Sequence, residues 1–248
     1  MKFVIISQVG NQEDRIYDWI YYHQALGFDT FIIFDDHSKD GSVQEIKRAQ
    51  KDFKNINIIL DYSDLEGQFY DVEQCKSSEN YGHHSFLSRM NRSYNRGNDL
   101  VKKINPDAIC TFIDQDEFIF TNSENVDIIY KTFKNQKCCQ ILVYSFDVKN
   151  DYNLEKGFMF KNDFTRWEYS ELENSKYRGR CKPIFISKHL NQCEYVHVPI
   201  QSPEKKTYEF RNYDDLRILH FRKPNLPNSE HFKCTEDINF KNFLKKIK

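Results

Sequence analysis

Three acidic side chains follow directly after an apolar run in the middle of the chain. The segment 109–118 reads ICTFIDQDEF, so Asp114, Asp116 and Glu117 come behind a run that is typical of a buried strand. Two carboxylates two residues apart point the same way if the strand continues, and such oxygen ligands suit Mg²⁺ or Mn²⁺. Three adjacent carboxylates also repel one another unless a cation compensates. The spacing predicts a divalent-metal site that binds phosphate oxygens; a solvated turn is the alternative.

A second group of polar side chains follows another buried run. The run 30–34, TFIIF, leads into 35–42, DDHSKDGS. As local structure this is a strand-to-helix turn, with Asp40 or Ser42 as the residue that caps the helix. As chemistry, Asp35 at the strand end is placed to accept a hydrogen bond from a nucleobase imino group. Both interpretations hold together, because they use different residues of the turn.

The elements that must position these side chains alternate between strand and helix. The apolar periodicity predicts strands over 3–8, 30–34 and 57–60 and helices over 16–26 and 41–51. This alternation is typical of an α/β fold with a mostly parallel central sheet flanked by helices. Ligands of such sheets bind at the carboxyl ends of the strands, which is where both polar turns lie.

The rest of the chain is less regular. We expect a helix over 83–104, a strand over 109–113, a helix over 125–133, a strand over 139–146, and short strand-like pieces before a basic helix near 236–247. No internal repeat or linker is evident. The sequence therefore predicts one domain, 1–248, with a regular half over about 1–147 and a less regular half over about 148–248.

Composition excludes several classes of protein. Lys and Arg number 36 against 37 Asp and Glu, a formal net charge of -1, so nothing predicts bulk attraction to nucleic acid. The apolar runs are too short for a transmembrane helix, and no signal-peptide core follows the first residues. The 7 cysteines include no CxxC pair, which argues against a zinc ribbon. We expect a cytoplasmic protein.

Together these segments resemble a known family. VGNQEDRIYDWIYYHQALG, TFIIFDDHSKDGS and FIDQDEFI are similar to segments of GT-A fold glycosyltransferases, most of all family 92 and the family 2-like enzymes. The resemblance spans about 3–222. It is carried by Asn11, Trp19, His23, Gly27, Asp35, Ser38, Asp114, Asp116, Glu117 and Phe118, and more loosely by Lys182, His197, His220, Phe221 and Arg222.

The resemblance implies a Rossmann-like nucleotide-diphosphosugar transferase fold and a metal-dependent hexosyltransferase activity. It also implies that about 1–147 bind the nucleotide sugar and that about 148–248 form the acceptor side. In such enzymes Asp116 binds Mn²⁺ (or Mg²⁺) and Asp114 lies near the donor ribose or the metal. A later histidine completes the metal shell; we expect His220, with His197 as the alternative. The resemblance implies a UDP-sugar donor, with UDP-galactose favoured, and a glycan, lipid-linked or protein acceptor.

Other residues are expected to bind the donor or act as the base. Asn11 and Asp35 belong to the donor site by resemblance, and Lys182 and Arg222 are expected to contact phosphate, with surface ion pairs as the alternative. An inverting transferase needs a base to deprotonate the acceptor hydroxyl. We expect Glu168 in this role, since the neighbouring Trp167 is suited to stack on a sugar.

Two other functions fit part of the pattern. A nucleotidyltransferase shares the α/β topology and acidic metal chemistry, but the turn VGNQEDR lacks the Gly-rich basic loop typical of that class. A binding protein that holds a nucleotide sugar without turnover is the second alternative, although it need not keep both acids of the DQD segment. The basic C-terminal helix is typical of a solvated helix face rather than a nucleic-acid site.

Overall fold

The computed structural model describes residues 2–64, 86–149, 165–167, 181–192, 200–201, 206–221, 234–236 and 238–247. The first elements are β1 (Phe3–Val9), α1 (Ile16–Leu26), β2 (Thr30–Asp35), α2 (Ser42–Asp52), β3 (Asn57–Tyr62), α3 (Phe86–Ile104), β4 (Ile109–Phe112), β5 (Glu117–Thr121) and α4 (Asp127–Gln136). The later ones are β6 (Gln140–Lys149), β7 (Thr165–Trp167), β8 (Cys181–Ile186), the 3₁₀ turn η4 (Ser187–His189), β9 (Leu190–Gln192), β10 (Ile200–Gln201), β11 (Thr207–Phe210), β12 (Leu216–His220), β13 (Cys234–Glu236) and α6 (Ile238–Ile247).

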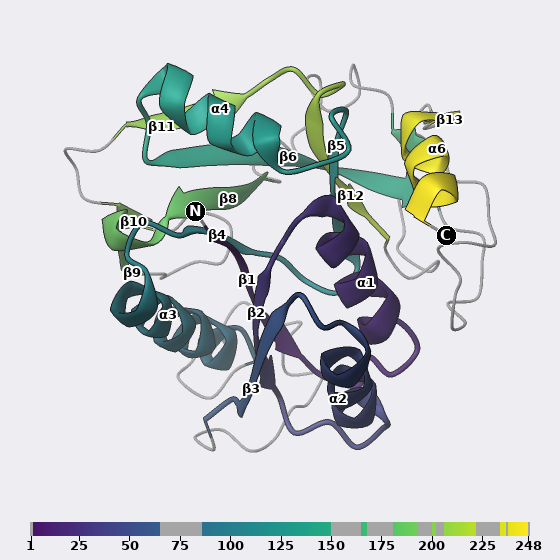
Figure 1. Cartoon of the computed structure of the whole chain (residues 1–248), viewed down its shortest axis with the longest axis vertical. Helices are drawn as coiled ribbons and strands as arrows, with labels where there is room; N and C mark the ends of the chain where they lie inside the picture. Colours follow the sequence, from purple (N-terminus) through teal and green to yellow (C-terminus); the bar gives the residue numbers. More distant parts are fainter. Residues whose placement is uncertain are drawn as a thin grey trace, which may run out of the picture.

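The N-terminal strands are buried on both faces because helices cover each side of the sheet. Alternate side chains of β1 and β2 point to opposite faces. Ile5 and Ile33 pack in the cluster that includes α1 and α2, whereas Ile6 and Ile32 pack with Tyr94 of α3. Figure 1 shows α1 and α2 on one side of these strands and α3 on the other. This burial explains why both strands are continuously apolar.

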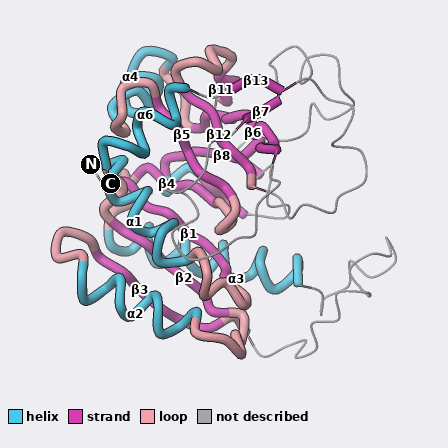
Figure 2. Tube along the Cα trace, turned by 90° about the vertical axis from the view of Figure 1, so that its right-hand side faces the viewer, coloured by secondary structure: helices cyan, strands magenta, loops and turns pink. Residues whose placement is uncertain are grey.

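The central sheet is mixed. Its strands follow the order β13-β7-β6-β8-β4-β1-β2-β3, and Figure 2 shows them running from β3 at one end to β13 at the other. Strands β3, β2, β1 and β4 pair in parallel, whereas β8 runs antiparallel to both β4 and β6. The α/β class is therefore confirmed. Parallel pairing dominates only the N-terminal strands; β8 pairs antiparallel with β4 and β6, and β5 pairs antiparallel with β12.

Most predicted elements lie within a few residues of their observed bounds. Gly27 ends α1 as expected, with a φ of 112° that an L side chain rarely adopts. The strand β5 is an exception, since the sequence pattern predicted no element between 113 and 125. The strand-like piece 194–199 lies outside the described residues. None of the described helices combines the length and apolarity needed to cross a membrane.

Candidate functional site

The carboxyl ends of three neighbouring strands meet at one edge of the sheet. In the parallel register Val9 of β1 pairs with Asp35 of β2, and Ile6 pairs with Phe112 of β4. The two polar turns that follow β2 and β4 therefore emerge on either side of β1. Their sequence positions are far apart, and parallel pairing brings them to the same edge, as the sequence predicted.

The acidic segment forms a tight turn and does not continue the strand. β4 ends at Phe112, and the backbone N–H of Glu117 donates to the Asp114 carbonyl at 3.1 Å before β5 begins. The expectation that Asp114 and Asp116 point the same way along one strand rested on that continuation, which does not occur. The two carboxylates instead have different partners.

Asp114 is held by a buried lysine. Lys182 of β8 is 1% exposed, and its Nζ lies 2.8 Å from Asp114 Oδ2 and 3.0 Å from Glu117 Oε2. Burial alone would lower the pKa of Lys182, but the two carboxylates raise it above its ordinary value. Glu117 Oε2 also accepts from the Asp114 N–H at 3.0 Å, and Tyr94 Oη donates to Asp114 Oδ1 at 3.3 Å. These contacts hold the turn against the buried side of the sheet edge.

Asp116 meets a histidine from the last third of the chain. β12 pairs antiparallel with β5, which sets His220 opposite Glu117 and brings its Nε2 to 3.3 Å from Asp116 Oδ2. The Phe221 N–H donates to the Asp116 carbonyl at 2.6 Å, so both the backbone and the side chain of Asp116 contact the end of β12. Burial would raise the pKa of Asp116, but the charges of His220 and Arg15 lower it below its ordinary value.

The Asp116–His220 pair has the chemistry of a divalent-cation site. The two side chains are 30% and 16% exposed, so both reach the surface of the turn. Their 3.3 Å separation is near the roughly 3 Å that two neighbouring ligands of one octahedral ion keep. Among the described residues no three His, Cys, Asp or Glu side chains form a ready-made cage. Two protein ligands still fit Mg²⁺ or Mn²⁺, because such ions complete their shells with phosphate oxygens and water.

Side chains of α1 hydrogen-bond to the backbone of β5. Trp19 Nε1 donates to the Glu117 carbonyl at 2.9 Å, and Tyr22 Oη donates to the Ile119 carbonyl at 2.8 Å. His23 Nε2 lies 3.3 Å from the Ile119 N–H and its Nδ1 2.9 Å from the Trp19 carbonyl. Burial lowers the pKa of His23 to about 3, so this imidazole is neutral. Its role is to position the strand that follows the acids.

The turn after β2 is closed by the loop after β1. Asn11 Oδ1 accepts from the Lys39 N–H at 2.8 Å, and the Asn11 N–H donates to Ser38 Oγ at 3.0 Å. Asp35 is 1% exposed and its carboxylate accepts from the Ser38 N–H at 3.1 Å. Asn11 and His37 hold positive φ values of 52° and 56°. The predicted donor-site residues Asn11 and Asp35 therefore shape one shared turn.

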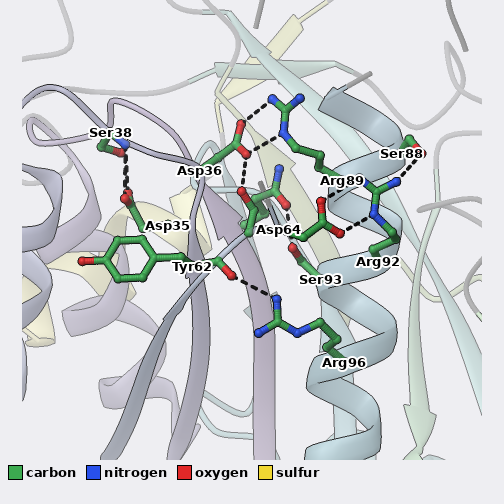
Figure 3. Close-up of polar contacts among 12 residues, drawn as sticks. Asp35, Asp36, Ser38, Tyr62, Asp64, Ser88, Arg89, Arg92, Ser93 and Arg96 are labelled. Carbon is green, nitrogen blue, oxygen red and sulfur yellow. Dashed lines mark hydrogen bonds and ion pairs between the residues drawn. The ribbon is translucent and has the colours of Figure 1, made fainter. Parts of the chain in front are cut away.

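A row of arginines on α3 faces the turn after β2 and the end of β3 (Figure 3). Arg89 binds Asp36 through two contacts, Nε to Oδ1 at 2.8 Å and Nη2 to Oδ2 at 2.9 Å. One turn further along the helix Arg92 binds Asp64, with Nη2 2.7 Å from Oδ1. Arg96 donates to the Tyr62 carbonyl at 3.1 Å. The sequence pattern did not identify this row, although its spacing of three and four residues marks one helix face.

Three predicted site residues are not placed. Glu168, His197 and Arg222 lie outside the described residues, so their roles as base, alternative metal ligand and phosphate contact stay predictions. Lys182 is placed, and it pairs with two carboxylates of the turn. A separate signal for that pairing existed in the sequence, since a lysine in an apolar strand needs a buried acid.

Comparisons with known proteins give distant likenesses only. No protein-family description and no curated protein matches this sequence. Residues 1–349 of TarS from S. aureus, solved in complex with UDP, share 14% identity at a TM-score of 0.48, over 90% of this chain and 61% of that one. Glucosyl-3-phosphoglycerate synthase from Mycobacterium tuberculosis, in complex with phosphoglyceric acid, shares 11% at 0.38, over 76% and 58%.

A third likeness is UDP-glucose pyrophosphorylase complexed with UDP-glucose, with 8% identity and a TM-score of 0.35, over 99% of this chain and 98% of that one. The chain thus spans less than two thirds of the first two structures. At these TM-scores we draw no functional conclusion from any of the three. Function has to follow from the site itself.

Proposed function

We propose that this chain is a metal-dependent glycosyltransferase that moves a sugar from a nucleoside diphosphate donor to an acceptor hydroxyl. The observation that carries the proposal is the Asp116–His220 pair, 3.3 Å apart and partly exposed, at the same sheet edge as the turn that contains Asp35. A cation site beside a strand-end turn matches a nucleoside diphosphate sugar, in which the ribose separates the base from the diphosphate that carries the sugar.

Asp116 and His220 are the residues that would hold Mn²⁺ or Mg²⁺. The ion supplies Lewis-acid stabilisation of the negative charge that develops on the diphosphate as the glycosidic bond breaks. Lys182 and Glu117 act on Asp114 by holding the acidic turn in place. Asp114, which accepts a hydrogen bond from Tyr94 at 3.3 Å, is proposed to lie near the donor ribose or near the metal.

The nucleobase end is assigned to the turn after β2. Tyr62 pairs with Asp35 in the sheet register and is 52% exposed, and its ring stacks on His37 with centroids 6.2 Å apart. Exposed aromatic rings are suitable platforms for a base. Asp35 has carboxylate lone pairs beyond the one used by Ser38, and these suit a nucleobase imino group. We favour a uracil base and therefore a UDP-sugar, with UDP-galactose as the first candidate.

The proposals for the acceptor base and for the stereochemistry rest on the sequence alone. We propose an inverting reaction in which Glu168 takes the proton of the acceptor hydroxyl as the sugar carbon is attacked. The acceptor is a glycan, a lipid-linked precursor or a protein. A Glu168→Gln variant that kept full transfer activity would remove Glu168 from this role.

The test uses the full chain with Mn²⁺ and a panel of UDP-, GDP- and CMP-sugars, with release of nucleotide as the readout. We expect one UDP-sugar to be turned over, and Asp116→Asn to slow release by about 100-fold or more. The matched control is Asp107→Asn, which changes an exposed carboxylate paired with Lys188 away from the site. Nucleotide binding without release would favour the non-catalytic binding protein, and no binding of any nucleotide sugar would end the proposal.

A further inference from the structure

Arg15 is a buried cation that no described residue pairs with. It directly precedes α1 and is 7% exposed, which makes it one of three buried arginines in the described part of the chain, with Arg89 and Arg217. Arg89 pairs with Asp36, and Arg217 donates to two backbone carbonyls and lies 4.0 Å from the Phe120 ring centroid. Within the described ranges the Arg15 guanidinium makes no hydrogen bond and no ion pair.

The direction of Arg15 follows from how α1 lies along β5. Trp19 contacts the carbonyl of Glu117, and His23, one turn later, contacts the N–H of Ile119. Four helical residues advance about 6 Å and two strand residues about 6.6 Å, so helix and strand stay in step. Arg15 lies one turn before Trp19, whose N–H donates to the Arg15 carbonyl at 2.9 Å, so it is at the end of α1 that faces the turn before Glu117.

Charge agrees with that placement. Burial lowers the pKa of Arg15, and the charge of Asp116 is the largest influence that opposes the shift, ahead of that of the exposed Asp14. Arg15 in turn lowers the pKa of Asp116, after the larger effect of His220. Asp116 is thus the charge that acts most on Arg15, although the two side chains form no ion pair. The guanidinium nitrogens of Arg15 are not among the described buried polar atoms that lack a partner, so a ligand can reach them.

We propose that Arg15 binds the diphosphate of the donor, beside the Asp116–His220 pair. This rests on the proposed function and adds a specific contact to it. A guanidinium presents a planar fork of donors that matches two phosphate oxygens, and it stays charged when buried. The start of α1 thus has two roles. Trp19 and His23 position β5, and Arg15, just before the helix, binds the diphosphate of the leaving group.

The test measures equilibrium binding of UDP, uridine and inorganic pyrophosphate in Mn²⁺ to the full chain and its variants. We expect Arg15→Ala to weaken UDP and pyrophosphate binding by about 10- to 100-fold, since a hydrogen bond to a charged group contributes about 1.5–3 kcal/mol. Uridine binding should not change. Arg15→Lys should recover part of the loss, because it keeps the charge without the fork. Arg48→Ala, at an exposed arginine of α2, is the matched control.

The outcomes separate the two proposals. Equal UDP affinity in the wild-type chain and Arg15→Ala, with melting curves that show both are folded, overturns the role of Arg15. A wild-type chain that binds no UDP refutes the proposed function, and the pyrophosphate arm then still decides on Arg15. If Arg15→Ala does not fold, the comparison of Arg15→Lys with Arg48→Lys decides, and equal pyrophosphate affinity in those two overturns the inference.

Discussion

Arg89 donates to both carboxylate oxygens of Asp36, at 2.8 and 2.9 Å, and the side chains of Arg89 and Asp36 are only 3% and 4% exposed. Asp36 immediately follows Asp35, so this contact ties the turn after β2 to α3. Removing one partner of a buried ion pair leaves an uncompensated charge. We expect Arg89→Ala to lower the free energy of unfolding by about 3–5 kcal/mol, measured by urea denaturation.

Arg96 is the matched control for that measurement. It pairs with Asp61 from the same helix face, but the two side chains are 46% and 50% exposed. Exposed pairs contribute little, so Arg96→Ala should change the free energy of unfolding by about 1 kcal/mol or less. Equal losses for both variants would contradict the assignment of Arg89 as the anchor of the turn.

Lys182 is predicted to be essential for stability because it compensates two acids at once. In Lys182→Met the carboxylates of Asp114 and Glu117 lose their buried cation, and we expect a loss of about 3–5 kcal/mol in the free energy of unfolding. Adding Glu117→Gln should recover part of this loss, since it removes one uncompensated charge. Calorimetric unfolding at neutral pH checks both variants. A double variant no more stable than Lys182→Met would show that the pairing is not what Lys182 contributes.

Loss of the contact between Trp19 and Glu117 should weaken Mn²⁺ binding at the proposed site as well as lower stability. Trp19→Phe deletes a hydrogen bond that holds the residue next to Asp116, and a lost positioning contact typically costs 10- to 100-fold in metal affinity. Tyr22→Phe deletes a similar bond to Ile119, two residues further from the acids. Both variants should lose about 1 kcal/mol or more of stability, but only Trp19→Phe should weaken Mn²⁺ binding. Equal Mn²⁺ affinities would refute the positioning role.

Acid should destabilise the protein through His23. Burial lowers its pKa in the folded chain to about 3, against about 6.5 in the unfolded chain. Between these values the unfolded state binds one more proton, so stability rises with pH, and it falls by about 1 kcal/mol for each pH unit below 6.5. His23→Gln should flatten this part of the profile, as measured by urea denaturation from pH 4 to 7. An unchanged slope would mean that other groups dominate.

The parts of the fold with strong periodicity were predictable. The N-terminal strands are continuously apolar because helices bury both of their faces, and α1 and α2 carry clear apolar stripes. The strand β5 was missed because EFIFT begins with an acid that reads as a turn residue. Only tertiary pairing with β12 reveals that Glu117 is already in a strand.

Some contacts of the candidate site could be expected from the sequence, and others could not. Asp116 and His220 could be paired from the sequence by resemblance alone, since no local pattern links residues so far apart. The orientations of Asp114 and Asp116 depended on whether β4 continued, which packing decides. Arg15 and Arg89 carry no local signal, because an arginine near a helix end is usually a solvated charge.

The pairing of Asp116 with His220 joins residues separated by 104 positions. Among the described strands β5 pairs only with β12, which follows much later in the chain. A nascent chain that has not yet released β12 therefore holds an acidic turn without its imidazole. Chains truncated before this strand would be unable to assemble the pair, so the proposed metal site can form only after His220 has been synthesised.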